Sequence, residues 1–277
     1  MSLTVPALGC LYFWTNPEGS GRLSDQETKF RLLRDRGFTA NGYELFLLPR
    51  FLDGNARPSP DFVEETQRTD LVTAHIGDFE PQFLLNEEMN KKMGLLGSML
   101  WTLKIRHVVI HAHHFEVNRQ KAIDSIKRNL PFAEIWIENN GRDSNWGYLP
   151  SGLLELFKDF RDAKFVFDIA HVDEQPGRQT VADYLEKEEL FERLAEIHCS
   201  FSTIPGNLSD VYREKGFKGY NAFHALYSLM DKTPSSDLLA KMRHCRKVVE
   251  GVVPREDVQM TSLSRELEIF SGKNVLN

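Results

Sequence analysis

The chain has 277 residues, of which 41% are hydrophobic and 27% charged, and its formal net charge is −6 at pH 7. This composition is that of a globular protein, and it excludes collagen-like, coiled-coil and disordered chains. The negative charge gives no general basic field for nucleic acid or an anionic membrane, and no apolar run reaches the roughly 18 residues of a membrane helix. Three cysteines without CxxC spacing and an N-terminus without a basic region predict a cytoplasmic protein.

Short apolar runs alternate with longer amphipathic stretches along the chain. The runs are rich in β-branched and aromatic residues and predict strands at Ala7–Trp14, Tyr43–Leu48, Leu71–Ile76, His107–His111, Glu134–Glu138, Phe165–Ile169, Glu196–Phe201 and Lys247–Val253. Apolar residues at three- and four-residue intervals predict helices at Asp25–Arg36, Pro60–Arg68, Asn86–Leu103, Asn118–Asn129, Pro150–Phe160, Val181–Leu194 and Asp257–Phe270. The irregular stretch Ser202–Tyr220 is expected to be a functional loop.

The alternation favours a single (β/α)8 TIM barrel, one domain over residues 1–277. Several runs are apolar almost throughout, which is typical of strands buried on both faces of a parallel sheet. An open doubly wound sheet is the alternative fold. It is less favoured because the sequence contains neither GxGxxG nor a P-loop to bind phosphate groups.

Polar side chains stand at or near the ends of six consecutive predicted strands. They are His75, His111, Glu138, Asp168 with His171, His198, and Glu250. Because the C-terminal strand ends of such barrels share one rim, we expect these side chains to lie together. Each alone has a structural explanation, such as a core histidine or a helix-capping carboxylate. Together they are the ligand types of zinc, manganese and related ions, and a cation would relieve the repulsion between buried carboxylates.

The order and spacing of these residues resemble the xylose isomerase-like barrel superfamily, which holds sugar isomerases, sugar epimerases and endonuclease IV. The common metal quartet of that superfamily is matched by Glu138, Asp168, His198 and Glu250, and its Asp-x-x-His by Asp168 and His171. His75 and His111 match further ligands of the endonuclease IV branch, and His224 resembles the histidine of its late Asp-x-His.

The resemblance implies one to three divalent ions per chain, zinc or manganese. Glu138 would bridge two of them. His75 and His111 would hold one ion and Asp168, His198 and Glu250 the other, while His171 and His224 would hold a third.

Four features depart from the endonuclease pattern, one of them being Ala225-Leu226-Tyr227-Ser228 in place of a glycine-rich segment after the late histidine. Ala222 replaces an aspartate ligand, Ala112-His113 replaces a proline-glycine, and the loop Trp14–Gly21 lacks a histidine. Because these segments shape the DNA site, a small phosphorylated or sugar substrate is expected in preference to duplex DNA. We expect His113 to contact that substrate and Arg142 or Arg213 to hold its phosphate.

Two enzymatic functions are compatible with this site. The first is an endonuclease IV-like phosphoester hydrolase that uses a metal-activated water, and His75 and His111 favour it. The alternative is a metal-dependent sugar or sugar-phosphate isomerase or epimerase in which Glu138 and Glu250 exchange protons on opposite faces of a carbon. A non-enzymatic barrel, either with a structural metal or as a binding protein, is disfavoured, because structural ions occupy closed sites rather than an open rim. The sequence leaves the oligomeric state open.

Overall fold

The computed structural model describes residues 3–77, 83–141, 147–173, 180–202, 214–217 and 224–271. The strands are β1 Thr4–Pro6, β2 Tyr43–Leu47, β3 Val72–Ile76, β4 His107–His111, β5 Glu134–Glu138, β6 Lys164–Asp168, β7 Leu194–Cys199 and β8 Arg246–Val249. All neighbouring strands pair in parallel, in the order β1-β8-β7-β6-β5-β4-β3-β2. A parallel bridge between Ala7 and Glu44 brings β1 and β2 together, so the strands form a nearly closed (β/α)8 barrel, as predicted.

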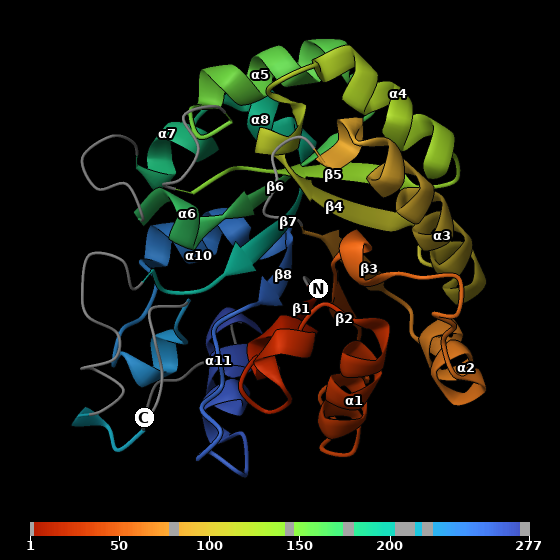
Figure 1. The fold of residues 1–277 in the computed structure, drawn as a ribbon. Coiled ribbons are helices and arrows are strands. Elements are labelled where there is room, and N and C mark those ends of the chain that lie inside the picture. The colour runs from red at the N-terminus through yellow and green to blue at the C-terminus, as the bar shows by residue number, and fades with distance from the viewer. Residues whose placement is uncertain are drawn as a thin grey trace.

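Helices surround the ring of strands (Figure 1). They are α1 Leu23–Arg34, α2 Pro60–Arg68, α3 Glu87–Leu103, α4 Arg119–Asn129, α5 Pro150–Asp159, α6 Ile169–Asp173, α7 Val181–Leu185, α8 Glu188–Arg193, α10 Ser236–Lys241 and α11 Thr261–Ser271. Their apolar faces bury side chains such as Leu100, Ile126 and Phe157 against the outside of the barrel. No helix in the described part of the chain combines the length and the apolar character needed to cross a bilayer.

The prediction of the first strand is wrong. β1 is Thr4–Pro6, and most of the predicted stretch Ala7–Trp14 continues as the 3₁₀ helix η1, Leu8–Leu11, and turns. Leu8, Cys10 and Leu11 are fully buried in the main hydrophobic core rather than paired in the sheet. A short apolar run has the same pattern whether it is buried in a strand or in a turn of helix, so periodicity does not distinguish the two.

Helix boundaries differ from prediction toward the C-terminus. The predicted helix 181–194 is split into α7 and α8, and its last residue begins β7. The last helix begins at Thr261 rather than at Asp257, because Met260 has a left-handed φ of 53°. The Asp257 carboxylate instead accepts hydrogen bonds from the backbone N–H groups of Thr261 and Ser262. The short helix α10 is not among the predicted helices.

Candidate metal centre

The C-terminal ends of six strands bring the predicted metal-binding residues together. His75 lies in β3, His111, Glu138 and Asp168 end β4, β5 and β6, His198 lies in β7, and Glu250 directly follows β8. His171 lies in α6, which begins directly after β6, and His224 precedes the bridge of Ala225 with Phe201. Because alternate residues of a strand point to opposite faces, the strand residues of this set share the inner face of the barrel.

Glu138 is the centre of this cluster and its side chain is fully buried. Its Oε2 lies 3.1 Å from His75 Nε2 and 3.3 Å from His111 Nε2. The same oxygen lies 3.5 Å from His198 Nδ1, and Oε1 lies 3.4 Å from His171 Nδ1. One carboxylate is therefore in contact with imidazoles from four different places along the chain.

Asp168 is the second buried carboxylate of the cluster. Its Oδ2 lies 3.2 Å from His171 Nε2 and 3.9 Å from His224 Nδ1, while Oδ1 accepts a hydrogen bond from the N–H of Ala170. Asn139 fixes this position, because its side chain accepts from the Asp168 N–H at 2.8 Å and donates to the Asp168 carbonyl at 3.0 Å. The N–H of Ala170 thus orients the Asp168 carboxylate, and the Asn139 side chain, directly after β5, fixes the Asp168 backbone.

The buried charges shift the protonation of this cluster strongly. Burial lowers the pKa of His75, but the carboxylates of Glu138, Glu250 and Glu44 raise it to about 10. Burial raises the pKa of Glu138, yet the surrounding histidines hold it well below its ordinary value. Burial raises the pKa of Asp168 to about 6 against the opposing effect of His171. The carboxylates therefore depend on nearby positive charge, which histidinium or a bound cation can supply.

Several polar atoms of the cluster form ion pairs but no hydrogen bonds with the residues that the structure describes, and such atoms suit metal ions. Within the described residues, both carboxylate oxygens of Glu138, Oδ2 of Asp168 and Nδ1 of His198 are buried and make no hydrogen bond. Groups of possible ligand atoms within 4.8 Å of one another are found in four combinations. They are His75, His111 and Glu138; Glu138, Asp168 and His198; Asp168, His171 and His224; and Glu44, His75, His198 and Glu250. This mixture of nitrogen and oxygen donors fits zinc or manganese.

The expected substrate contacts are only partly described. His113 follows β4 in the 3₁₀ helix η5, Ala112–Phe115, and its ring centroid lies 5.4 Å from that of His111. Asn140 holds it, with Oδ1 at 3.1 Å from both the backbone nitrogen and Nδ1 of His113. Burial, followed by the charge of His111, lowers the pKa of His113 to about 4. Arg142 and Arg213 lie outside the described residues.

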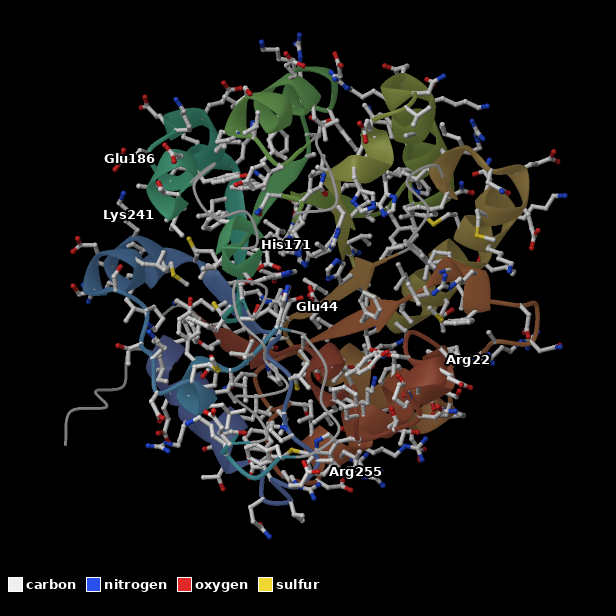
Figure 2. The ribbon with its side chains drawn as sticks, turned by 60° about the vertical axis from the view of Figure 1, so that its left-hand side comes forward. Arg22, Glu44, His171, Glu186, Lys241 and Arg255 are labelled. Atoms are coloured by element: carbon white, nitrogen blue, oxygen red, sulfur yellow. The ribbon has the colours of Figure 1, made fainter. Side chains whose placement is uncertain are left out.

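The structure adds Glu44 and Glu196 to the residues around the cluster. Both are buried, and both lie within 3.5 Å of His198 Nε2. Figure 2 shows Glu44 and His171 in the middle of the ring of strands. The sequence does contain a signal for both residues. Glu44 is an acidic residue within the otherwise apolar strand Tyr43–Leu47, and Glu196 lies two residues before His198 in β7.

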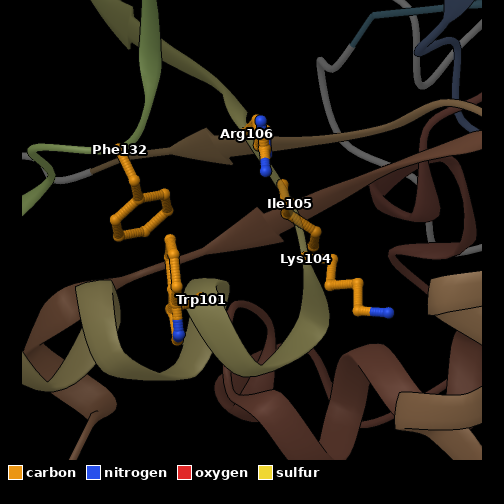
Figure 3. A pocket seen from close by; sticks show the side chains of 5 residues that line it. All are labelled: Trp101, Lys104, Ile105, Arg106 and Phe132. Atoms are coloured by element: carbon orange, nitrogen blue, oxygen red, sulfur yellow. The ribbon is translucent and has the colours of Figure 1, made fainter.

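A separate pocket of about 280 Å³ lies at the opposite rim of the barrel (Figure 3). It is lined by Trp101, Lys104, Ile105 and Arg106, which precede β4, and by Phe132, which precedes β5. Its lining contains neither imidazole nor carboxylate, so it lacks the possible metal ligands found around Glu138. The nearby His107 stacks on Trp136 with ring centroids 4.7 Å apart, so its ring is packed away from Glu138.

The segment that carries His224 is anchored by the C-terminal helix. The N–H of Val252 donates to the carbonyl of His224 at 2.9 Å. Tyr227 and Ser228 follow His224 closely in the chain. Their backbone N–H groups donate hydrogen bonds to the buried Glu266 carboxylate of α11, both at 2.8 Å. Burial raises the pKa of Glu266 from 4.5 to about 7, although these hydrogen bonds oppose the shift.

We therefore expect Glu266 to make stability depend on pH. Because its pKa is raised in the folded state, the native protein retains this proton more strongly, and stability falls as pH rises from about 4.5 to about 7. The full shift corresponds to about 3 kcal/mol. Urea unfolding of the parent and of Glu266→Gln between pH 5 and pH 8 should show this decline in the parent and a flatter profile in the variant. The exposed Glu268→Gln on the same helix is the control, and parallel profiles for the parent and Glu266→Gln would contradict the expectation.

Known structures share this fold, whereas comparison of the sequence with protein-family models and with curated proteins gives no match. A crystal structure described as AsfvAP:AG is 13% identical, with a TM-score of 0.60 over 98% of this chain and 98% of its own. A D-tagatose 3-epimerase-like protein is 16% identical, with a TM-score of 0.54 over 99% of each chain. Endonuclease IV from Thermus thermophilus is 13% identical, with a TM-score of 0.52 over 87% of this chain and 91% of its own. The chain thus has the fold that the resemblance to xylose isomerase-like barrels implies.

Proposed function

We propose that this protein is a divalent-metal-dependent enzyme that hydrolyses a phosphoester with a metal-activated water. The observation that carries the proposal is the sharing of carboxylates between neighbouring ligand groups. Glu138 belongs both to the group of His75 and His111 and to the group of Asp168 and His198, and Asp168 extends the series to His171 and His224. Shared carboxylates are the means by which two or more ions are held close together, an arrangement common in phosphoester hydrolysis.

In this proposal some residues of the cluster bind the metal ions and others face the substrate. The side chains of His111, His224 and Glu250 are 24%, 25% and 15% exposed, whereas Glu138 and His198 are at most 1% exposed. In this proposal the buried residues hold the ions and the more exposed ones border the opening through which substrate approaches. Divalent ions bound there would polarise the phosphoester and make a water nucleophilic near neutral pH.

The proposed substrate is a small phosphorylated molecule rather than duplex DNA. The net charge of −6 gives no general attraction for a polyanion, so recognition of a phosphate must be local. His113, held by Asn140 beside His111, is a proposed substrate contact, together with Arg142 and Arg213. We place the enzyme in the cytoplasm, in keeping with the free cysteines Cys10, Cys199 and Cys245.

A second candidate is a sugar or sugar-phosphate isomerase or epimerase. Two observations favour it: Glu138 Oε2 and Glu250 Oε1 lie 3.5 Å and 3.2 Å from the same atom, His198 Nδ1, and the similarity to the D-tagatose 3-epimerase-like protein covers 99% of both chains. In this alternative the two carboxylates form the acid–base pair. One ion would suffice, and His75 and His111 would contact the substrate.

Metal content and reaction type together test the proposal. Protein purified without chelator is analysed for bound metal, and then assayed against bis(p-nitrophenyl) phosphate, p-nitrophenyl phosphate and a panel of ketoses. We expect two or more zinc or manganese ions per chain, and phosphoester hydrolysis that chelation abolishes and added metal restores. One ion with ketose epimerisation and no hydrolysis would favour the alternative. Protein that binds no divalent ion would refute both functions.

A further inference from the structure

A polar layer lies inside the barrel, below the metal-binding cluster. It consists of Glu44 in β2, Thr73 in β3, Glu196 in β7 and Arg246 in β8, and each is at most 7% exposed. The strand register pairs Glu44 with Thr73 and Glu196 with Arg246. The interior layers of such barrels are usually filled by Val, Ile and Leu, and burying charge is costly. Three of these four buried side chains are charged, which is unusual for an interior layer of a barrel.

The imidazole of His198 connects the polar layer with the metal-binding cluster. Its Nε2 lies 3.0 Å from Glu196 Oε1 and 3.5 Å from Glu44 Oε2. Its other nitrogen, Nδ1, lies 3.2 Å from Glu250 Oε1 and 3.5 Å from Glu138 Oε2. The ring thus directs Nε2 toward the polar layer and Nδ1 toward the cluster.

His75 connects the same two levels with its nitrogens reversed. Its Nδ1 lies 3.7 Å from Glu44 Oε1 and 3.7 Å from Glu250 Oε1, whereas its Nε2 lies 3.1 Å from Glu138 Oε2. Glu44 consequently faces both histidines, with Oε1 toward His75 and Oε2 toward His198.

The two glutamates are themselves held in place. The guanidinium of Arg246 has Nε 3.0 Å from Glu196 Oε2, and its Nη2 donates to the carbonyl of Tyr43 at 3.4 Å. The hydroxyl of Thr73 donates to Glu44 Oε2 at 3.1 Å. Neither carboxylate can turn away from the histidines without losing one of these contacts.

We propose that Glu44 and Glu196 are positioning residues that determine which ring nitrogen each histidine presents to metal. Glu196 accepts the proton on His198 Nε2 and leaves Nδ1 as the ligand. The negative charge of Glu44, with Oε1 3.7 Å from His75 Nδ1, favours the proton on that nitrogen and leaves Nε2 as the ligand. Carboxylates behind metal-binding histidines fix the tautomer, and their loss weakens metal binding by about 10- to 100-fold. This inference rests on the metal centre of the proposed function.

Metal affinity is the first test, measured by competition with a chromophoric zinc chelator. Glu44→Met removes one acceptor, and the double variant Glu196→Met/Arg246→Met removes the other without leaving an unpaired buried arginine. Each should weaken zinc binding by about 10- to 100-fold. Glu196→Gln keeps an oxygen acceptor and should retain more affinity than the double variant. Glu134→Met is the control, because Glu134 contacts His107 at the opposite rim, and its zinc affinity should equal that of the parent.

Histidine NMR tests the tautomers directly in the parent protein. With ¹⁵N-labelled histidine and bound zinc, His75 should carry its proton on Nδ1 and His198 on Nε2, with signals assigned from single His→Gln variants. The opposite tautomers, or unchanged zinc affinity in both Glu44→Met and the double variant, would overturn the inference.

The metal-free protein separates this inference from the proposed function. A slowly exchanging His198 Nε2–H signal is expected in the metal-free parent and should be absent from Glu196→Met/Arg246→Met. If the parent binds no zinc, the proposed function fails, while this signal still supports the positioning role of Glu196. If the signal persists in the double variant, the positioning role fails whether or not metal binds.

Discussion

Glu138→Gln is expected to abolish activity and to weaken the binding of at least two metal ions together. Glu138 contributes to two of the ligand groups, and its oxygens lie within 3.5 Å of four histidine nitrogens. An amide keeps the size of the side chain but removes the negative charge that attracts the ions and replaces one oxygen donor with an NH₂ group. Metal affinity should fall by about 100-fold or more, and turnover by orders of magnitude.

The measurement is metal content by elemental analysis together with kcat and KM for the substrate that the parent turns over. Glu134→Gln is the matched control, because Glu134 begins the same strand at the opposite rim and is 41% exposed at its side chain. It should keep the metal content and activity of the parent. Full activity and full metal content in Glu138→Gln would mean that this carboxylate has only a structural role, and both enzymatic functions would then lose their central residue.

The double variant His75→Ala/His111→Ala is expected to distinguish the two candidate functions. The rings belong to adjacent strands, their centroids lie 4.9 Å apart, and both direct Nε2 toward Glu138 Oε2. In a hydrolase with paired ions, the variant should lose one ion and retain the one held by Glu138, Asp168, His198 and Glu250. Hydrolysis should fall by orders of magnitude, because two ions stabilise the attacking and leaving oxygens together.

The isomerase alternative gives a different result for the same variant. If one ion is held by Glu138, Asp168, His198 and Glu250, its content should be unchanged, and the main effect should be a higher KM because only substrate contacts are lost. His107→Ala is the control, since it removes a histidine from the other end of β4. An unchanged metal count in the double variant would lead us to abandon the hydrolase in favour of the isomerase.

Much of the candidate site could be predicted because it depends on strand ends. His111, Glu138 and Asp168 each follow a nearly continuous apolar run, and β4 and β5 have the predicted boundaries. In a parallel barrel, the C-terminal end of every strand reaches the same rim, so the position of a residue in its strand is enough to place it. The first strand was harder to predict, because the apolar residues of η1 are buried in the core without pairing in the sheet.

The sequence by itself determined the barrel, the rim and the types of donor group, because these follow from local periodicity and from the repeat of strand and helix. Only the tertiary structure decided which possible metal ligands lie close to one another, and that Glu44 and Glu196 face His198 from β2 and β7. These strands are far apart in the chain and on different sides of the ring, so their side chains meet only when the barrel closes. The closure of the barrel and the relative shift of neighbouring strands depend on the pairing of all eight strands. The hydrophobic pattern within any one strand does not encode them.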